Sequence, residues 1–392
     1  MTSSPRSPSR RTAGAALATL VVAALVATTP AAASGGHRHS PRAGLEFRGE
    51  ATIPAGAVFE DADIGDTVVG GLSSITYDRW RDVYYAISDA RPELGQGTWR
   101  FYTLDIDLGD GRLDPGDVTV LDVTPLTDAA GEAFPDATVD PEGLTLTRRR
   151  TLVVTSEGFA LPANAVSPWV REFGLDGRQL RELPLPDYAD PVPGTSGVRN
   201  NLGPESAAVT PGGRFLFTGF ENALVQDGPA ATLDTGSPAR LQRFDARTGV
   251  LQREYVYPTD PVAEPPGPAG SFTVNGLVEV LPLSPWRLLS MERSFSVGAG
   301  NTVRLYSVSL LGATDVLGDA DLDDTPSRVR PARKRLVLDL DVLGLTLDNI
   351  EGMTLGPRMG RHGRALVLVS DNNFTPGQDT QLLLFSARGR GR

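Results

Sequence analysis

The sequence predicts an all-β fold, a single β-propeller with six blades, from three observations. Short strand-like segments rich in β-branched and aromatic residues recur from Leu45 onward, separated by Gly, Pro and Asp. No amphipathic helical pattern longer than two turns occurs in the same region. A motif of a polar turn followed by a strand that ends on an acid returns at intervals of 64 to 79 residues. Repeats of this size, built from strands and turns, are typical of propeller blades.

Five copies of this motif are visible along the chain. Their strands end, in order, on Asp89, Glu157, Glu221, Glu292 and Asp371. About 345 residues would make five blades of roughly 69 residues or six of roughly 58, whereas a typical four-stranded blade has about 40–50. We therefore expect six blades, with one that lacks the acid in the long interval between Glu292 and Asp371.

The repeated acids predict a ring of carboxylates around the propeller axis, because the inner strands of all blades converge there. Carboxylates gathered in one place repel one another unless a cation neutralises them. Calcium takes six to eight oxygen ligands, so it suits such a ring. The predicted metal ligands are Asp89, Glu142, Glu205, Glu221, Glu292, Asp371 and Asn372. The alternative is that these acids cap turns and face solvent.

Three motif copies carry a second acid ahead of the strand-end acid. These pairs are Glu142 and Glu157, Glu205 and Glu221, and Glu351 and Asp371, which lie 15, 16 and 20 residues apart. A β-hairpin spanning such a distance would bring the two acids of each pair together. From this set, Glu157 and Glu351 are the predicted catalytic carboxylates.

The composition excludes several kinds of chemistry. The chain has no cysteine, so disulfides, thiol nucleophiles and Cys-ligated zinc are excluded. Two of its three histidines, His37 and His39, precede the strand region, and no Gly-x-Ser-x-Gly motif is present. The net charge of −11 argues against nucleic acids and anionic membranes as partners. Catalysis would then depend on carboxylates, a bound metal, arginine and water.

Four residues beside the acids are candidates for holding an anionic substrate group. Arg293 directly follows Glu292 and is the third predicted catalytic residue. Arg91, Arg199 and Asn201 are the predicted substrate-binding residues, because they lie next to the motif acids. The alternative for each arginine is a surface salt bridge.

The N-terminus predicts an export signal. Arg6, Arg10 and Arg11 precede an apolar run from Ala15 to Ala27, and three alanines at 31–33 offer a cleavage site. We expect a signal peptide at 1–33, a disordered leader at 34–44 and one propeller domain at 45–390. The export route would be Sec or, from the Arg10-Arg11 pair, twin-arginine. The mature protein would be a monomer without a membrane span, secreted or in the cell envelope.

The motifs, taken in order, resemble the phytase-like family described by "esterase-like activity of phytase". The matching segments are Gly71-Leu-Ser-Ser-Ile-Thr76 with Ser88-Asp89, Asp140-Pro-Glu-Gly-Leu144 with Ser156-Glu157, Asn201-Leu-Gly-Pro-Glu-Ser206 with Phe220-Glu-Asn222, Asn275-Gly276 with Met291-Glu-Arg293, and Asn349-Ile-Glu-Gly352 with Ser370-Asp-Asn-Asn373. The resemblance implies an exported bacterial propeller grouped with phosphoester or ester hydrolases. It does not imply that phytate is the substrate.

Three functional hypotheses follow. The first is a secreted, calcium-dependent hydrolase that cleaves phosphoester or carboxylic ester bonds of a small anionic or ester substrate. The second is a calcium-dependent lactonase of the gluconolactonase type. The third is a non-catalytic propeller that binds a ligand and uses calcium only for stability. Turnover of esters, of lactones or of neither separates the three.

Overall fold

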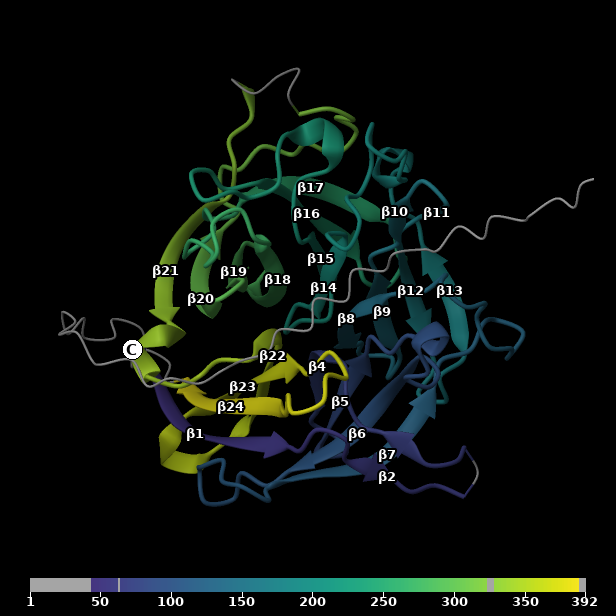
Figure 1. Ribbon diagram of the computed structural model, residues 1–392, viewed down its shortest axis with the longest axis vertical. Helices are drawn as coiled ribbons and strands as arrows, with labels where there is room; N and C mark the ends of the chain where they lie inside the picture. The colour runs from purple at the N-terminus through teal and green to yellow at the C-terminus, as the bar shows by residue number, and fades with distance from the viewer. Residues whose placement is uncertain (1–43, 63, 323–327, 388–392) are drawn as a thin grey trace, which may run out of the picture. The chain divides into compact units, whose positions relative to one another are not determined.

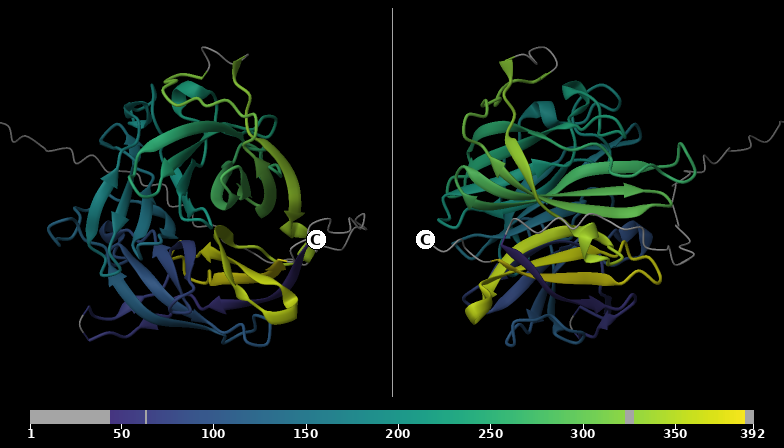
Figure 2. Two further views of the ribbon diagram at one scale, coloured as in Figure 1. Left: turned by 180° about the vertical axis from the view of Figure 1, so that it is seen from behind. Right: turned by 90° about the vertical axis from the view of Figure 1, so that its left-hand side faces the viewer.

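The protein is described by a computed structural model, which covers residues 44–62, 64–322 and 328–387. The predicted signal peptide and all but the last residue of the predicted leader lie outside the described residues. Five four-stranded antiparallel sheets are arranged around a common centre, as Figure 1 and Figure 2 show. Each sheet is one blade of a β-propeller.

The strands follow one another from the centre outward in four of the blades. Blade 1 contains β4 (Leu72–Asp78), β5 (Val83–Ser88), β6 (Arg100–Ile106) and β7 (Val118–Pro125). Blade 2 contains β8 (Pro141–Leu146), β9 (Leu152–Ser156), β12 (Trp169–Phe173) and β13 (Gln179–Leu183). Blade 3 contains β14 (Pro204–Val209), β15 (Phe215–Phe220), β16 (Pro238–Asp245) and β17 (Leu251–Pro258). Blade 4 contains β18 (Thr273–Ser284), β19 (Arg287–Ser296), β20 (Gly300–Ser309) and β21 (Arg333–Asp339).

Blade 5 joins the two ends of the described chain. Its strands are β22 (Asn349–Arg358), β23 (Arg364–Asp371), β24 (Thr380–Ala387) and, outermost, β1 (Leu45–Ile53). β1 pairs with β24 in antiparallel register from Leu45 opposite Ala387 to Ile53 opposite Thr380. This pairing covers the edge of β24 and closes the ring of blades.

The remaining elements are short. Two hairpins form from β2 (Val58–Phe59) with β3 (Thr67–Val68) and from β10 (Phe159–Leu161) with β11 (Asn164–Val166). Short 3₁₀ helices lie at Pro92–Leu94, Asp187–Ala189, Val225–Asp227, Leu340–Leu343 and Gly360–His362. No α-helix occurs in the part of the chain that the structure describes.

The predicted all-β propeller is confirmed, but the predicted number of six blades is wrong. The interval between Glu292 and Asp371 contains β20 and β21, the connection between them and β22, and no additional four-stranded sheet is found among the described residues. β18, β19 and β20 have 12, 10 and 10 residues, which makes them longer than typical strands. Long strands and long connections, rather than a further blade, account for the excess length.

The hydrophobic core lies between neighbouring blades. Tyr84 and Tyr102 of blade 1 pack in one cluster with Val367 and Leu384 of blade 5, and Ile87 of blade 1 packs in another with Val154 of blade 2. Burying an aliphatic or aromatic side chain of this size contributes about 1.5–3 kcal/mol. Because both faces of each blade are covered, the inner strands are apolar along most of their length.

Each inner strand has a shift in register near its first residues. The shifts lie between Leu72 and Ser74, Pro141 and Leu144, Pro204 and Ser206, Leu277 and Glu279, and Ile350 and Gly352. Such bulges re-aim side chains and are frequent beside functional sites. In three blades a residue within the bulge is glutamate, namely Glu142, Glu205 or Glu351.

Small residues follow the bulge in four of the five blades, where the inner strands approach one another closely. A Cβ atom on Gly143 would lie 2.6 Å from backbone atoms of Ser206 and Ala207, and one on Gly352 would lie 2.9 Å from Cα of Ser74. The centre is therefore tightly packed next to the bulge glutamates, so these acids lie beside a closed layer of the propeller.

Candidate carboxylate site at the propeller centre

The acids of the motif reach the centre from two kinds of position. Asp89, Glu157 and Glu221 directly follow β5, β9 and β15, and Asp371 ends β23. Glu142, Glu205 and Glu351 lie in the bulges of β8, β14 and β22. Because β4–β5, β8–β9 and the corresponding pairs are antiparallel hairpins, the start of each inner strand lies beside the end of the next strand.

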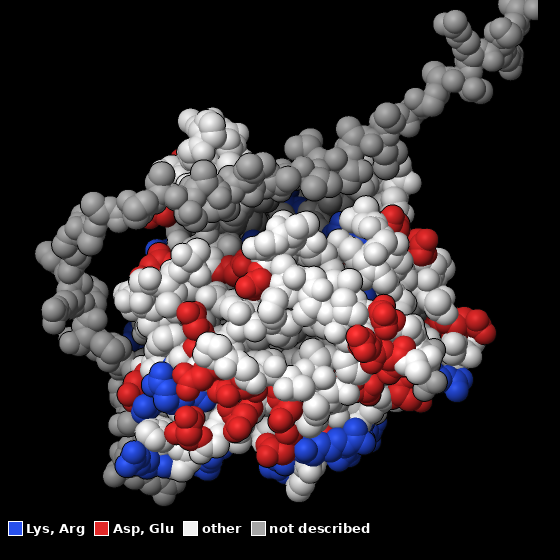
Figure 3. Space-filling model, turned by 60° about the horizontal axis from the view of Figure 1, so that its bottom comes forward, with Lys and Arg blue, Asp and Glu red and all other residues white. Residues whose placement is uncertain are grey.

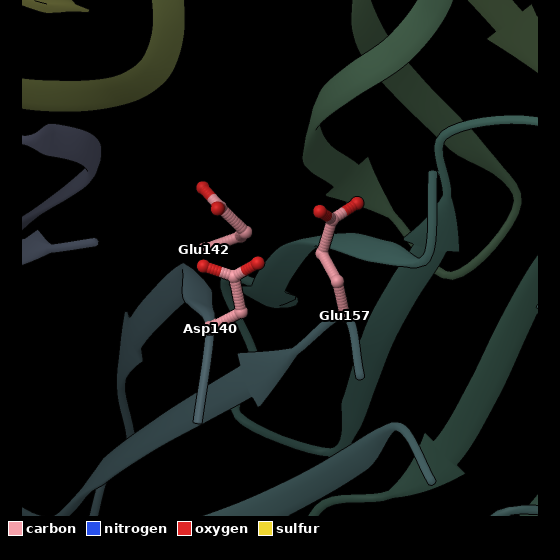
Figure 4. A group of neighbouring side chains, drawn as sticks. All are labelled: Asp140, Glu142 and Glu157. Carbon is pink, nitrogen blue, oxygen red and sulfur yellow. The ribbon is translucent and has the colours of Figure 1, made fainter. Parts of the chain in front are cut away.

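Two groups of carboxylates are close enough to share a ligand. In one group, Asp140, Glu142 and Glu157 each offer an oxygen within 4.8 Å of the others; Figure 4 shows these side chains projecting from neighbouring strand ends. In the second group, Glu157, Glu205 and Glu221 meet the same criterion. Glu157 belongs to both groups, and all five side chains are buried.

Several buried polar atoms of this centre have no hydrogen-bond partner among the described residues. They are Oδ1 of Asp89, Oε2 of Glu157, Oε1 of Glu221 and Nε of Arg293. Leaving a buried polar group unsatisfied costs about 1–3 kcal/mol, and more when the group is charged. The unsatisfied oxygens therefore indicate that the centre binds a cation or retains protons.

The electrostatics of the centre favour neutralisation of its acids. Burial, together with the nearby Asp140 and Glu351, raises the pKa of Asp89 to about 8. Burial raises the pKa of Glu221 to about 7, although the neighbouring Arg293 opposes this rise. The pKa values of Glu142, Glu157, Glu205 and Asp371 are also raised well above their usual range, first by burial and then by neighbouring carboxylates.

Two arginines provide fixed positive charge beside the carboxylates. Arg293 donates to Glu351 at 2.7 Å and lies 3.9 Å from Glu221. Arg91 donates to Asp140 and to Oδ1 of Asn201, both at 3.1 Å. The predicted residues Arg91, Asn201 and Arg293 thus lie next to the carboxylates.

Neighbouring groups fix the orientation of several acids. The backbone N–H of Gly203 donates to Oε1 of Glu157 at 2.7 Å, and Nδ2 of Asn349 donates to Glu351 at 2.9 Å. The backbone N–H of Asn373 donates to Asp371 at 2.7 Å.

The structure does not bring Glu292 to the centre. Glu292 accepts hydrogen bonds from Tyr257 at 2.7 Å and from the backbone N–H of Asp260 at 2.8 Å, and it forms an ion pair with Lys334. Arg293, opposite Gly276, has the ladder position that Asp371 has opposite Asn349 in blade 5. Side chains alternate along a strand, so this shift of one residue turns Glu292 away.

Arg199 and Asn372 make contacts that hold loops in place. Arg199 donates to the backbone carbonyls of Ala223 at 3.1 Å and Gly228 at 2.5 Å. Oδ1 of Asn372 accepts from the backbone N–H groups of Gly71 at 3.0 Å and Phe374 at 3.1 Å. Neither residue belongs to the two carboxylate groups.

Sequence reasoning missed two polar residues of the centre. Asp140 belongs to the first carboxylate group, and Asn349 donates to Glu351 and, at 3.5 Å, to Asp371. Each lies two residues before a predicted site glutamate, Glu142 or Glu351. The two-residue period of β-strands was the signal that could have identified them.

Burial, rather than acidity, distinguishes this centre from the rest of the molecule. Figure 3 shows several acidic patches with basic patches between them on one side of the surface. The central glutamates, by contrast, are at most 8% exposed. His362, the one histidine that the structure describes, lies in the 3₁₀ helix Gly360–His362, beyond the opposite end of β22 from Glu351.

The fold and the site together define a five-bladed β-propeller with a buried carboxylate cluster at its centre. The family described as "Phytase-like: Esterase-like activity of phytase" matches residues 67–374. The chain therefore belongs to the phytase-like family. Comparison with curated proteins gives no significant match.

Solved structures with similar folds include three of different activity. An endo-arabinase from Bacteroides thetaiotaomicron matches with a TM-score of 0.45 and 10% identity over 88% of this chain and 98% of the other. A periplasmic gluconolactonase from Pseudomonas aeruginosa matches with a TM-score of 0.35 and 12% identity over 88% and 96%. A PQQ-bound aldose sugar dehydrogenase from Streptomyces coelicolor matches with a TM-score of 0.32 and 14% identity over 86% and 93%. Similarities of this strength carry no argument about substrate.

Proposed function

We propose that the protein is an exported, calcium-dependent hydrolase of phosphoester or carboxylic ester bonds, with its active site at the central carboxylate cluster. The observation that carries this proposal is the set of buried, unpartnered oxygens around Glu157. Membership of a family described by esterase-like activity supports the reaction class.

The residues of the cluster fit a calcium ion. Asp140, Glu142, Glu157, Glu205 and Glu221 supply only carboxylate oxygens, the hard ligands that calcium prefers. A cation held there would polarise a phosphoryl or carbonyl oxygen and lower the pKa of a bound water. Unpartnered oxygens on Glu157 and Glu221 leave ligand capacity that the protein itself does not use.

The protein's own residues would then bind the substrate and move a proton. Arg293 and Arg91 lie beside the carboxylates and would hold an anionic group of the substrate. Glu351 would accept the proton of the attacking water, because Arg293 and Asn349 fix its orientation and oppose the rise in its pKa that burial causes. Arg199 is left out of this proposal, since its guanidinium binds backbone carbonyls.

Hydrolysis assays with and without calcium test the proposal. We expect turnover of p-nitrophenyl phosphate or p-nitrophenyl acetate that is lost in EDTA and restored by calcium. Glu351→Gln should lower turnover by about 10²–10⁴-fold, the usual contribution of a general base. Glu132→Gln, which changes an exposed acid in the connection before β8, is the matched control and should retain full activity.

Each other result of the assays favours a different function. Turnover of glucono-δ-lactone alone would replace the ester hydrolase with a lactonase. Calcium-dependent stability without turnover of any ester or lactone would overturn the hydrolase and favour a non-catalytic binding propeller. Normal turnover by the Glu157→Gln, Glu351→Gln double variant would show that the centre is not the active site.

The proposed setting is outside the cytoplasm, with a small-molecule substrate and a monomeric enzyme. The charged and apolar pattern of residues 1–33 supports export. Among the described residues, no helix has the length and apolar character needed to cross a membrane. Cell fractionation of the native producer with detection of the mature N-terminus tests the export.

A further inference from the structure

We propose that the central cluster binds two divalent cations that share Glu157, both on the side of the centre formed by blades 2 and 3. This inference rests on the cation site of the proposed function and specifies its stoichiometry and position. The first cation would lie among Asp140, Glu142 and Glu157, and the second among Glu157, Glu205 and Glu221.

The geometry places two sets of ligands side by side rather than one large set. Glu157 directly follows β9 and belongs to both groups, with Glu142 in the inner strand of its own blade and Glu205 in that of blade 3. The inner strands β8 and β14 are neighbours. A carboxylate with one oxygen for each cation is a common bridge between metal ions, and Oε2 of Glu157 has no protein partner.

The hydrogen bonds of the cluster are consistent with this division. Oε1 of Glu157 accepts one hydrogen bond, from the backbone N–H of Gly203, which leaves a further lone pair for a ligand. Oε1 of Glu221 is also buried and unpartnered, at the far side of the second group. Both groups therefore contain at least one buried oxygen that the described protein leaves unsatisfied.

The charge of the centre also requires more than one divalent ion. Eight acids meet here, Asp89, Asp140, Glu142, Glu157, Glu205, Glu221, Glu351 and Asp371, against the two arginines Arg91 and Arg293. One divalent cation would leave a large negative charge in a buried region, where uncompensated charge is costly.

Blade 4 explains why the cations would lie to one side. At the ladder position where blades 1, 2, 3 and 5 have an acid, blade 4 has Arg293, whose guanidinium binds Glu351 at 2.7 Å. A fixed positive charge repels metal ions from this side. It leaves the blade 2 and blade 3 carboxylates, which no arginine except Arg91 contacts within hydrogen-bonding distance, as the cation side.

Calcium titration of the purified protein after EDTA treatment tests the stoichiometry. Isothermal titration calorimetry and native mass spectrometry should both give two calcium ions per chain. Glu142→Gln and Glu221→Gln should each reduce the number to one, because each removes a ligand from one group only. Glu157→Gln should weaken both sites by more than about 10-fold, since even residues that merely support a metal ligand typically contribute that much.

The outcomes separate this inference from the proposed function. One calcium ion in the unmodified protein, or the same loss from Glu142→Gln and Glu221→Gln, overturns the two-cation site even if esters are hydrolysed. Two ions without any turnover support the two-cation site and reject the hydrolase. No calcium binding rejects both. Glu132→Gln is again the control and should keep two ions, and circular dichroism checks that each variant folds.

Discussion

Arg293 determines the character of the centre more than any single acid. Its guanidinium is 11% exposed, donates to Glu351 and lies within ion-pair distance of Glu221. Burial and these carboxylates affect its pKa in opposite directions, and the carboxylates prevail, so the pKa rises. Arg293 therefore stays charged and supplies in blade 4 the neutralisation that a bound cation would supply elsewhere.

Glu279 is a second residue with a large effect at the centre, although it is not part of the carboxylate groups. It lies in the bulge of β18 and reaches across to blade 1, where Oγ of Ser74 donates to it at 2.8 Å. Burial raises the pKa of Glu279 well above its usual range, while Ser74 and the backbone N–H of Val280 oppose the rise. No arginine, lysine or histidine of the described chain forms a salt bridge with it.

We expect Glu279→Gln to raise the melting temperature at pH 8 but not at pH 4. A carboxyl group whose pKa is higher in the folded than in the unfolded state binds its proton more tightly when folded. Its favourable contribution is complete below the unfolded pKa of about 4.3 and is lost as the pH rises through the folded pKa. Glutamine is neutral at every pH and can still accept from Ser74, so it avoids this loss.

Thermal melting of both proteins across this pH range measures the effect. The difference in melting temperature between Glu279→Gln and the unmodified protein should increase steadily with pH. A constant difference, or a variant that is less stable at pH 8, would mean that the Glu279 carboxylate is stabilised in its charged form. Glu182→Gln, at an exposed position of β13, is the matched control and should show no such trend.

At the scale of the strands, the sequence predicted positions well where each blade follows the same register. The inner-strand glutamates Glu142 and Glu205 and the strand-end acids Glu157 and Glu221 meet in pairs, as the hairpin argument predicted. The prediction failed in blade 4, where Met291-Glu-Arg293 looks like the other strand ends but places Arg293 at the centre. A shift of one residue reverses the side to which every side chain points, and pattern alone does not determine it.

β1 makes the ring of strands complete, and its removal should have a large effect. Truncation before Pro54 deletes β1, exposes the edge of β24 and uncovers Leu382 and Leu384. An open strand edge pairs readily with other chains, so we expect loss of cooperative melting together with aggregation. Truncation before Gly44 leaves β1 intact and is the control.

Calorimetry and light scattering of the two truncated proteins provide the test. The longer truncation should lower the melting temperature strongly and increase scattering at temperatures where the control is clear. Equal melting of both proteins would show that the pairing of β1 with β24 contributes little, and that the other four blades and the rest of blade 5 hold the ring.

At the scale of the whole molecule, strand content and the recurrence of the motif were enough to predict a propeller, but the number of blades was not predictable from length. Connections such as the one from Leu310 to Ala332 in blade 4 lengthen a repeat without adding a sheet. The convergence of five blades also buries acids that appear in the sequence as ordinary turn residues. Their burial, and hence their need for neutralisation, depends on the closed ring.

The whole ring therefore predicts how stability depends on pH and on cations together. In the absence of cations, burial raises the pKa of Asp140 to about 6, of Glu221 to about 7 and of Asp89 to about 8. These groups stabilise the folded state most below their unfolded pKa values near about 4, and this stability is lost as the pH rises through 6 to 8. Protein in EDTA should thus melt at lower temperature at pH 8 than at pH 6.

Calcium should reverse this trend, because it binds the ionised carboxylates and not the protonated ones. At 100 times its dissociation constant, a cation bound at one site adds about 2.7 kcal/mol to the free energy of unfolding. The rise in melting temperature on addition of calcium should therefore be larger at pH 8 than at pH 6. A rise that is the same at both pH values would mean that calcium binds elsewhere on the acidic surface, where the carboxylates are already ionised at pH 6.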